Sequence, residues 1–557
     1  MPSPLFFTNK KSDAPHLRTW AEFRRQIKRG AYGSIWTQIE KQAQKDLKGS
    51  LLTPSSITPG RQPDQALHAN RDFSISVAVC QRILRTALLF KVTGNKAFKE
   101  TCLQEIYNVC DPDVWVEWRD KSHVHHGFPA DLRTGWISRD VALAYNWLRS
   151  SLTKKQRRKI LAGIDLMGIR PYLDSLPMNP NWLHKLSNWT TCIVGGMGVC
   201  GMALGDDHPD SGKLIEISKA TMGAYFDIFG PEGEFNESPG YAGSLMLVAK
   251  FYSALQCVEP SQSNRLAEFP FPQTARWIQY LALGPKRLAA FGDSHPDSPP
   301  FVPHYSAVAA ATGDPVIQGL ALHYGANAQG YTAPDVYQLL WIDPEIPARQ
   351  PGADYPRHAT FKAYGACFSS RSDWKKSGAD CVVYGKAGRE PYHSHPDAGQ
   401  VCLDAHGELL IQDLGLPAGG YPADNYDQYY NASVQGHNLL TINGEELVEK
   451  TTKGQFLSEG ALPDGLGVHW VYDLTDFHSQ AVTITRSVFH FLPNIVVVID
   501  YAHTKARAEF RLRWHPSKPI KIKDDGSFKF TQGKAALSAR VKSFGRASAT
   551  HTSGRHA

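Results

Sequence analysis

Two histidines separated by one residue are the first groups in this sequence that could carry out chemistry. His393 and His395 lie in PYHSHPDAGQ, residues Pro391–Gln400. On an extended chain, side chains two residues apart point to the same side. Imidazoles exchange protons near neutral pH and bind metal ions. Because polar residues flank the pair and a predicted strand follows it, we interpret it as functional rather than as core packing.

Asp413 and His437 could join one of these histidines around a metal ion. Asp413 closes a predicted strand in IQDLG, and His437 opens another in QGHNLL. Two histidines and one aspartate form a plausible Zn²⁺ set, which only the fold can bring together. The alternative is that Asp413 and His437 hydrogen-bond the backbone of turns.

The same segment also contains an H-x-H-x-D pattern, ending at Asp397, that occurs in metallo-β-lactamase-like hydrolases. Their motif continues with histidine, whereas Ala398 follows here. Their αβ/βα fold also differs from a chain in which a helical half precedes a strand half. We therefore do not assign the sequence to that class.

A carboxylate and a phenol stand four residues apart in EGEFNESPGY, residues Glu232–Tyr241. On a helix, Glu237 and Tyr241 would share a face, and the carboxylate could orient the hydroxyl. Pro239 and Gly240 instead predict that the helix begins within this segment. Tyrosine can act as an acid or base at a site that supports proton transfer; the alternative is a tyrosine packed within a helix.

Asn188, followed by Trp189, stands directly before an apolar helical stretch. Its side-chain amide could cap that helix or donate hydrogen bonds to the carboxylate of a ligand. The sequence leaves both roles open.

The helices and strands that must position these residues can be predicted from the spacing of apolar residues, which differs between the two halves of the chain. From about residue 14 to 340, apolar residues recur at helical spacing, and many helices of similar length joined by short loops suggest an α/α toroid or solenoid. The predicted helices are Ser74–Thr93, Arg139–Leu152, Lys154–Ser175, Thr190–Leu204, Ser211–Phe229, Pro239–Val258 and Thr274–Leu283.

After about residue 350 the period becomes two, which is typical of strands. The predicted strands are Ala359–Ser370, Cys381–Tyr384, Gln400–Ala405, Glu408–Gln412, Leu439–Ile442, Val482–Leu492, Ile495–Tyr501 and Glu509–Trp514. Prolines near residue 350 mark a boundary. The sequence thus predicts a multidomain α+β protein, with an (α/α) toroid over residues 1–345 and an antiparallel β-sandwich over residues 350–557.

The charge and the distribution of apolar residues argue against some classes of function. The net charge of +7 over 557 residues is mild and scattered, so it is compatible with an acidic ligand and argues against nucleic acid as a partner. We find no apolar run long enough to span a membrane. The compartment stays open, since a cytoplasmic protein and a periplasmic or secreted one whose signal has been removed both fit. An oligomer is also possible.

In the order helical half, E-S-P-G-Y, Y-H-S-H-P-D-A-G and Q-G-H-N-L-L, the sequence resembles the heparinase II/III-like polysaccharide lyases, which include relatives acting on alginate. The likeness runs from about residue 60 to 520. It implies the toroid and sandwich above, and cleavage of an anionic, uronate-containing polysaccharide, such as a glycosaminoglycan, by β-elimination. It implies no organic cofactor.

The resemblance also implies roles for individual residues. Tyr241 resembles the family's catalytic acid, which often serves as base too, Asn188 the amide that binds the uronate carboxylate, and His393 the base or charge-neutralising histidine. The remaining residues resemble a structural Zn²⁺ site (His395, Asp413 and His437) and groups that contact substrate or shape the cleft (Glu237, Asp293 and Tyr430).

The sequence departs from the family in two places. Several members follow the asparagine with a catalytic histidine, where this chain has Trp189; His184 or the cluster of His123, His125 and His126 could fill that space, and we take His125 as a substrate-binding candidate. An arginine that several members carry after the contacting tyrosine is also missing after Tyr430, so Tyr426 and Tyr429 compete for its role.

Two other functions remain open at this point. A glycoside hydrolase on a helical toroid would use carboxylates such as Glu234, Glu237 and Asp293 as acid and base. A non-catalytic polysaccharide-binding protein would bind the polymer and release no product.

Overall fold

The chain forms two compact units, each of which we describe by itself. The computed structural model describes residues 4–8, 17–56, 71–283, 287–296, 300–325, 336–374, 380–416, 429–448, 453–545, 547–548 and 550. The first unit comprises Met1–Ile228, Gly243–Pro272 and Phe301–Arg349, and the second comprises Phe229–Ala242, Gln273–Pro300 and Gln350–Ala557. Two segments from the helical part of the sequence therefore belong to the second unit.

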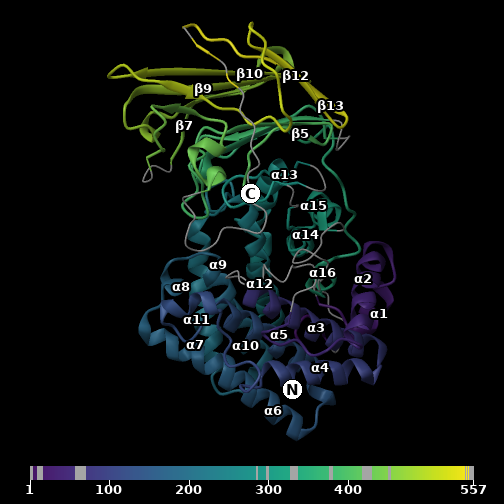
Figure 1. Ribbon diagram of the computed structural model, residues 1–557. Coiled ribbons are helices and arrows are strands. Elements are labelled where there is room, and N and C mark those ends of the chain that lie inside the picture. Colours follow the sequence, from purple (N-terminus) through teal and green to yellow (C-terminus); the bar gives the residue numbers. More distant parts are fainter. Residues whose placement is uncertain are drawn as a thin grey trace. The chain divides into compact units, whose positions relative to one another are not determined.

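The first unit is helical, as the apolar spacing predicts (Figure 1). Its helices are α1 (Trp20–Gln26), α2 (Gly30–Asp46), α3 (Arg71–Thr93), α4 (Lys96–Val109), α5 (Leu132–Leu148), α6 (Lys154–Ile164), α7 (Arg170–Ser175), α8 (Asn181–His184), α9 (Asn188–Thr190), α10 (Gly196–Leu204), α11 (Ser211–Ala224), α12 (Leu245–Val258), α14 (Tyr305–Thr312), α15 (Pro315–Gly325) and α16 (Val336–Trp341). Helix α13 (Phe271–Leu281) begins in this unit and continues in the second.

Small residues allow α5 and α10 to pack backbone against backbone in the centre of the first unit. Every residue of α10, GMGVCGMAL, is buried. A Cβ added to Gly196 would lie 2.4 Å from the carbonyl oxygen of Gly135 on α5, and one added to Gly135 would lie 2.2 Å from that of Cys192. Since real Cβ atoms do not approach so closely, only glycine fits at this crossing.

Several predicted helices are interrupted; Thr190–Leu204, for example, contains a π-helical turn over Thr191–Gly195 before α10. Lys154–Ser175 consists of α6, a π-helical turn over Asp165–Ile169, and α7. Pro239–Val258 begins with a 3₁₀ helix, Pro239–Ser244, before α12. The predicted start at Pro239 is therefore confirmed, and Glu237 lies outside the helix that carries Tyr241. Among the described helices, none combines the length and the apolar character that crossing a membrane requires.

The second unit is built from antiparallel sheets. The five-stranded sheet has the order β1-β2-β3-β4-β5, the four-stranded sheet the order β10-β9-β8-β7, and β11–β6 and β12–β13 form two pairs. The strands are β1 (His358–Thr360), β2 (Cys367–Arg371), β3 (Cys381–Lys386), β4 (Val401–Ala405), β5 (Glu408–Ile411), β6 (Leu440–Ile442), β7 (Gln455–Ala461), β8 (Gly467–Asp473), β9 (Ala481–Phe491), β10 (Ile495–Thr504), β11 (Phe510–Leu512), β12 (Ser527–Gln532) and β13 (Ala535–Arg540).

One hydrophobic core joins the two larger sheets of this unit into a sandwich. Buried residues of the five-stranded sheet, such as Phe368 and Val383, belong to the same cluster as Trp470 and Val488 of the four-stranded sheet. The rings of Phe368 and Trp470 stack with their centroids 4.5 Å apart. Strands β7, β8, β12 and β13 were not predicted from the sequence.

Strand pairing brings two chain segments to one end of the five-stranded sheet. Gly385, near the end of β3, pairs with Val401 at the start of β4, and Ile411 at the end of β5 pairs with Leu403. The segment between β3 and β4, which contains both motif histidines, therefore lies beside the residues that follow β5, including Asp413. This end of the sheet carries the candidate site.

Candidate active site

Tyr241 and His393 meet inside the second unit. Their rings stack with centroids 3.6 Å apart and planes inclined by only 11°. The phenol is half-buried on the 3₁₀ helix Pro239–Ser244, and the imidazole side chain is 31% exposed. A phenol and an imidazole, both groups that can transfer protons, thus share one partly accessible place.

Two carboxylates hold the imidazole of His393. Its Nδ1 lies 3.0 Å from Oδ2 of Asp293, and its Nε2 lies 3.3 Å from Oε2 of Glu237. Glu237 is fully buried and Asp293 nearly so. Because each ring nitrogen faces a carboxylate oxygen, the orientation of the ring is fixed from both sides.

Asp293 also binds the second histidine of the motif. Its Oδ1 lies 3.2 Å from Nε2 of His395, and its backbone N–H donates a 3.0 Å hydrogen bond to the carbonyl oxygen of His393. One residue from the segment FGDS therefore holds both histidines. The resemblance implies that Asp293 shapes a cleft, and in the structure its carboxylate contacts the imidazoles of His393 and His395.

The environment of Tyr241 keeps its hydroxyl protonated. Burial raises the pKa of this phenol well above its usual value, and the carboxylates of Asp293 and Glu237 raise it further. The hydroxyl is therefore a proton donor at neutral pH. The 3₁₀ helix that carries it is tied to the FGDS segment, since the N–H of Gly240 donates to Oγ of Ser294 at 2.8 Å.

Glu234 has a structural position. Its side chain is fully buried, and its two oxygens accept backbone N–H groups of Ala363 and Glu232, each at 2.9 Å. Both oxygens are thus used to hold the loop that leads to Tyr241. This burial argues against Glu234 as the acid or base of a glycoside hydrolase.

The close approach of two loops makes Gly292 a sensitive position. Its φ is +57°, and a Cβ would lie 2.2 Å from the carbonyl oxygen of His393, whose own φ is 53°. We expect Gly292→Ala to lower the free energy of unfolding by roughly 2–5 kcal/mol, because backbone strain and overpacking add.

Chemical denaturation measures this loss, with Gly313→Ala as the matched control. Gly313 has a φ of +74° but nothing within 4 Å of the added Cβ. We expect about 1–2 kcal/mol there, from strain alone. Equal losses at the two positions would show that the contact with His393 is unimportant.

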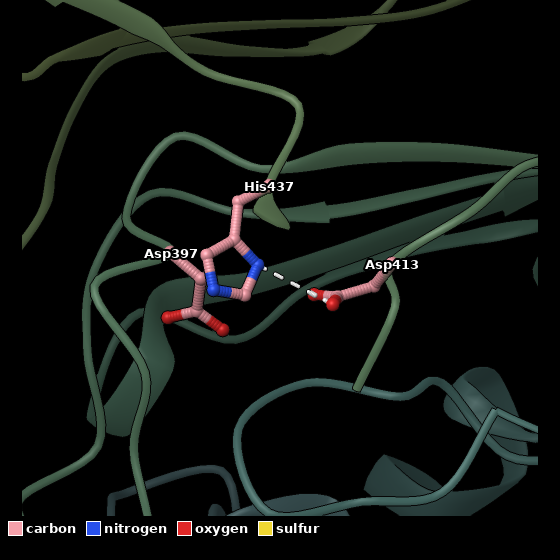
Figure 2. Close-up of side chains that lie close together, drawn as sticks. All are labelled: Asp397, Asp413 and His437. Carbon is pink, nitrogen blue, oxygen red and sulfur yellow. Dashed lines mark ion pairs between the residues drawn. The ribbon is translucent and has the colours of Figure 1, made fainter. Parts of the chain in front are cut away.

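Asp397, Asp413 and His437 form a buried group of three possible metal ligands (Figure 2). One ligand atom from each lies within 4.8 Å of the other two. His437 stands between the carboxylates, with its Nδ1 3.3 Å from Oδ1 of Asp413. The side chain of Asn438 helps to place it, donating to the carbonyl oxygens of Val401 and Gln412.

This donor set fits a divalent metal ion. Imidazole nitrogen and carboxylate oxygen are common zinc ligands. Nε2 of His437 and Oδ2 of Asp413 are buried and lack hydrogen-bond partners among the described residues. Burial lowers the pKa of His437, but the neighbouring carboxylates of Asp413 and Asp397 together outweigh it, and the pKa lies above its usual value.

The structure thus brings together two of the three predicted ligands and adds Asp397. His395 stays close, because its ring centroid lies 5.4 Å from that of His437, while its Nε2 contacts Asp293. Sequence reasoning named Asp397 only within H-x-H-x-D and did not take it as a ligand. Its position two residues after His395 was the available signal.

A second group missed from the sequence is Lys386 with Glu390. Lys386 ends the buried strand β3, and its side chain is fully buried together with those of Glu390 and Asp397. Its ammonium contacts Oε2 of Glu390 and lies 2.8 Å from Oδ1 of Asp397. A lysine at the end of an otherwise apolar buried strand was the only sequence signal.

Asn188 lies in the first unit, at the start of α9. The side chain that caps this helix is that of Ser187, in a reciprocal capping box with Thr190. The capping role considered for Asn188 thus belongs to its neighbour. Trp189 packs against the imidazoles of His123 and His126, with ring centroids 4.5 Å and 5.5 Å away.

His125 belongs to the same histidine cluster of the first unit. It is exposed, and its ring stands edge-on to that of His126 with centroids 4.2 Å apart. Nδ1 of His123 lies 3.2 Å from Oδ2 of Asp131, which fixes one member of the cluster. Imidazole and indole rings thus gather around Trp189, the residue that follows Asn188.

Tyr430 lies in the second unit on a short 3₁₀ helix, Tyr430–Ala432. It is half-buried, and its hydroxyl lies 3.4 Å from Nε2 of His515. His515 in turn contacts Oδ1 of Asn438, the residue after His437. Of the competing tyrosines, Tyr429 is described and Tyr426 lies outside the described residues.

Comparisons with known proteins agree with this architecture. Residues 378–554 match the family described as heparinase II/III-like, C-terminal. A mutant of the heparan sulfate lyase HepC from Pedobacter heparinus is 14% identical, with a TM-score of 0.58 over 92% of this chain and 78% of that one. A heparinase III, also 14% identical, has a TM-score of 0.58 over 91% and 76%.

No curated protein matches the sequence significantly. The structural likeness confirms the predicted fold class, a helical toroid followed by an antiparallel β-sandwich. The family match confirms the resemblance noted in the sequence, and it spans His393, His395, Asp413 and His437.

Proposed function

Since residues 378–554 belong to the heparinase II/III-like family, we propose that this protein is a polysaccharide lyase that cleaves a uronate-containing polysaccharide or oligosaccharide by β-elimination. The observation that carries the proposal is the stacked pair of Tyr241 and His393, held from behind by Asp293 and Glu237. The pair offers two proton-transfer groups at one accessible place.

The chemistry of a uronate explains why such a pair is needed. Its C5 hydrogen is α to a carboxylate, so removing the proton places a second negative charge beside the first. Donors must neutralise the carboxylate, a base must take the proton, and an acid must protonate O4 as the C4–O4 bond breaks. The product carries a C4–C5 double bond at its new non-reducing end.

We assign the acid role to Tyr241. Its pKa is raised by burial and by the two carboxylates, so the hydroxyl holds its proton until O4 leaves. Where C5–H and O4 lie on the same side of the sugar, Tyr241 serves both roles within one turnover: its hydroxyl gives a proton to O4 and its oxygen takes the proton from C5, which regenerates the neutral phenol. Where they lie on opposite sides, His393 is placed to be the base.

His393 is held in one orientation for this task. With Nδ1–H donated to Asp293, Nε2 is the nitrogen left to take up the proton, and to do so it must exchange its contact with Oε2 of Glu237, 3.3 Å away, for the substrate. Because Glu237 is fully buried, we assign it a positioning role through His393 rather than direct contact with the sugar. Asp293 acts likewise, through both histidines.

We propose that Asn188 binds the carboxylate of the uronate and stabilises its negative charge. Its amide N–H groups suit a carboxylate, and His125 with the neighbouring imidazoles could add positive charge. Tyr430 is proposed to contact the sugar. The mild excess of basic residues suits an anionic polymer.

We propose that the metal-binding group holds a structural zinc ion. Asp413 and His437 would bind it, together with His395 or with Asp397. When bound, the ion would cross-link the segments that follow β5 and precede β6 to the loop of the motif histidines. Proton transfer is left to Tyr241 and His393.

Incubation with heparan sulfate, hyaluronan, chondroitin and alginate tests the activity. We expect ultraviolet absorbance from the conjugated unsaturated uronate with at least one of these polymers. New reducing ends without absorbance would identify a hydrolase and overturn the proposal. Binding without any product would identify a polysaccharide-binding protein and overturn it equally.

A further inference from the structure

Three ionisable side chains are enclosed together behind the candidate site. Lys386, Glu390 and Asp397 each have 0% exposed side-chain area. Removing charges from water is costly, and apolar residues of similar size often pack as well or better. Such a group therefore calls for an explanation other than the stability of the sandwich.

The two oxygens of Asp397 have different partners. Oδ1 lies 2.8 Å from Nζ of Lys386, and Oδ2 accepts a 3.3 Å hydrogen bond from the backbone N–H of Gly292. With a partner on each oxygen, the carboxyl group of Asp397 has a fixed orientation.

Gly292 connects Asp397 to the imidazole of His393 through the backbone. The next residue, Asp293, donates its backbone N–H to the carbonyl oxygen of His393 and contacts Nδ1 of the same residue, each at 3.0 Å. The Cβ position of Gly292 is itself closed by that carbonyl oxygen. A continuous series of contacts therefore runs from the ammonium of Lys386 to the imidazole ring of His393.

We propose that Lys386 is a positioning residue for His393, acting through Asp397 and the Gly292–Asp293 backbone. Without the ammonium, Asp397 would turn toward the nearby imidazole of His437, and the N–H of Gly292 would lose its acceptor. The FGDS segment would then shift, and Asp293 would no longer hold Nδ1 of His393. The inference rests on the proposed function, because it concerns the same imidazole.

Lys386→Met in the full-length chain tests the proposal, since methionine keeps most of the length and removes the charge. The activity-independent readout is the side-chain Nδ1–H signal of His393 in protein labelled with ¹⁵N-histidine, recorded at one fixed pH. His393→Gln assigns this signal by its loss. We expect Lys386→Met to shift or exchange-broaden it in a protein that remains folded.

Arg371→Met is the matched control. Arg371 is also a nearly buried cation of the second unit, 3.5 Å from Asp380, and it donates to the carbonyl oxygen of Ala282. We expect this variant to lose stability and to keep the His393 signal. Equal changes in both variants would reduce Lys386 to a general structural role and overturn the proposal.

Kinetics supply the second readout. With a cleaved polymer in hand, Lys386→Met should lower kcat about 100-fold and change KM by less than about three-fold, because a displaced proton-transfer group impairs chemistry more than binding. Arg371→Met should keep kcat. If the wild type cleaves no polymer, the proposed function fails, while the His393 signal still decides this inference.

Asp397→Asn is the second variant, should Lys386→Met not fold. The amide keeps the shape but has one acceptor oxygen, so it cannot serve both Lys386 and Gly292. We expect the same change in the His393 signal. A folded variant of either kind with the wild-type signal and wild-type kcat would overturn the proposal.

Discussion

Tyr241→Phe should lower kcat by about 10³-fold or more and leave the fold intact. Positioned acid or base groups contribute about 10²–10⁴-fold, and here one hydroxyl would serve as acid and, for some linkages, also as base. The phenylalanine ring can keep the stack on His393, whose centroid lies 3.6 Å away. The initial rate of ultraviolet absorbance and the thermal transition measure the two effects separately.

Tyr280→Phe is the control for removing a hydroxyl from the second unit. Its hydroxyl donates to the carbonyl oxygen of Pro356 at 2.7 Å, outside the stacked pair. We expect it to lower the free energy of unfolding by about 1 kcal/mol and to keep kcat. Wild-type turnover in Tyr241→Phe would show that this phenol is not the acid.

His395→Ala should lower both the metal content and the thermal stability. The imidazole is fully buried between Asp293 and His437, so its removal leaves a cavity and takes a partner from Asp293. We expect a loss of roughly 2–5 kcal/mol from these effects alone. Losing a structural ion would add to it, since the binding free energy of such an ion stabilises the fold.

Elemental analysis of dialysed protein and denaturation with and without a chelator provide the measurements. His490→Ala is the matched control, because His490 is buried in the same unit but bonds Oγ of Ser370 at 2.9 Å. It should lose stability and keep its metal. A chelator should destabilise the wild type and leave His395→Ala unchanged. Active wild type without stoichiometric metal would remove the metal assignment.

Much of the local structure could be predicted because periodicity reports which face of a segment is buried. Apolar residues three and four apart predicted α3, which the structure begins at Arg71, and alternation predicted β9 and β10. The predicted strands Gln400–Ala405 and Glu408–Gln412 leave only His406 and Gly407 between them, and these residues form the turn between β4 and β5 with φ of 53° and 75°. In β8, which was missed, the buried residues Trp470 and Tyr472 alternate with half-buried positions, so its signal was present.

The candidate site was predictable only as a set of residue types. His393, His395, Asp413 and His437 could be chosen because imidazoles and carboxylates in polar segments next to strands are unusual for a core. The residues that contact these side chains could not be predicted, since each contact joins residues far apart in the chain. The contact between Asp293 and His393, which closes a separation of 100 residues, is one example.

The order of residues therefore set the two kinds of secondary structure and the groups capable of proton transfer or metal binding, because these depend on side-chain chemistry and short-range spacing. Strand order and loop contacts decided the rest. They moved Tyr241 and Asp293 into the sheet-rich unit, placed Asp397 beside Asp413 and His437, and put Lys386 behind them. Hydrogen bonds and charge pairs act over a few ångströms in space, and no local pattern records which distant residues come that close.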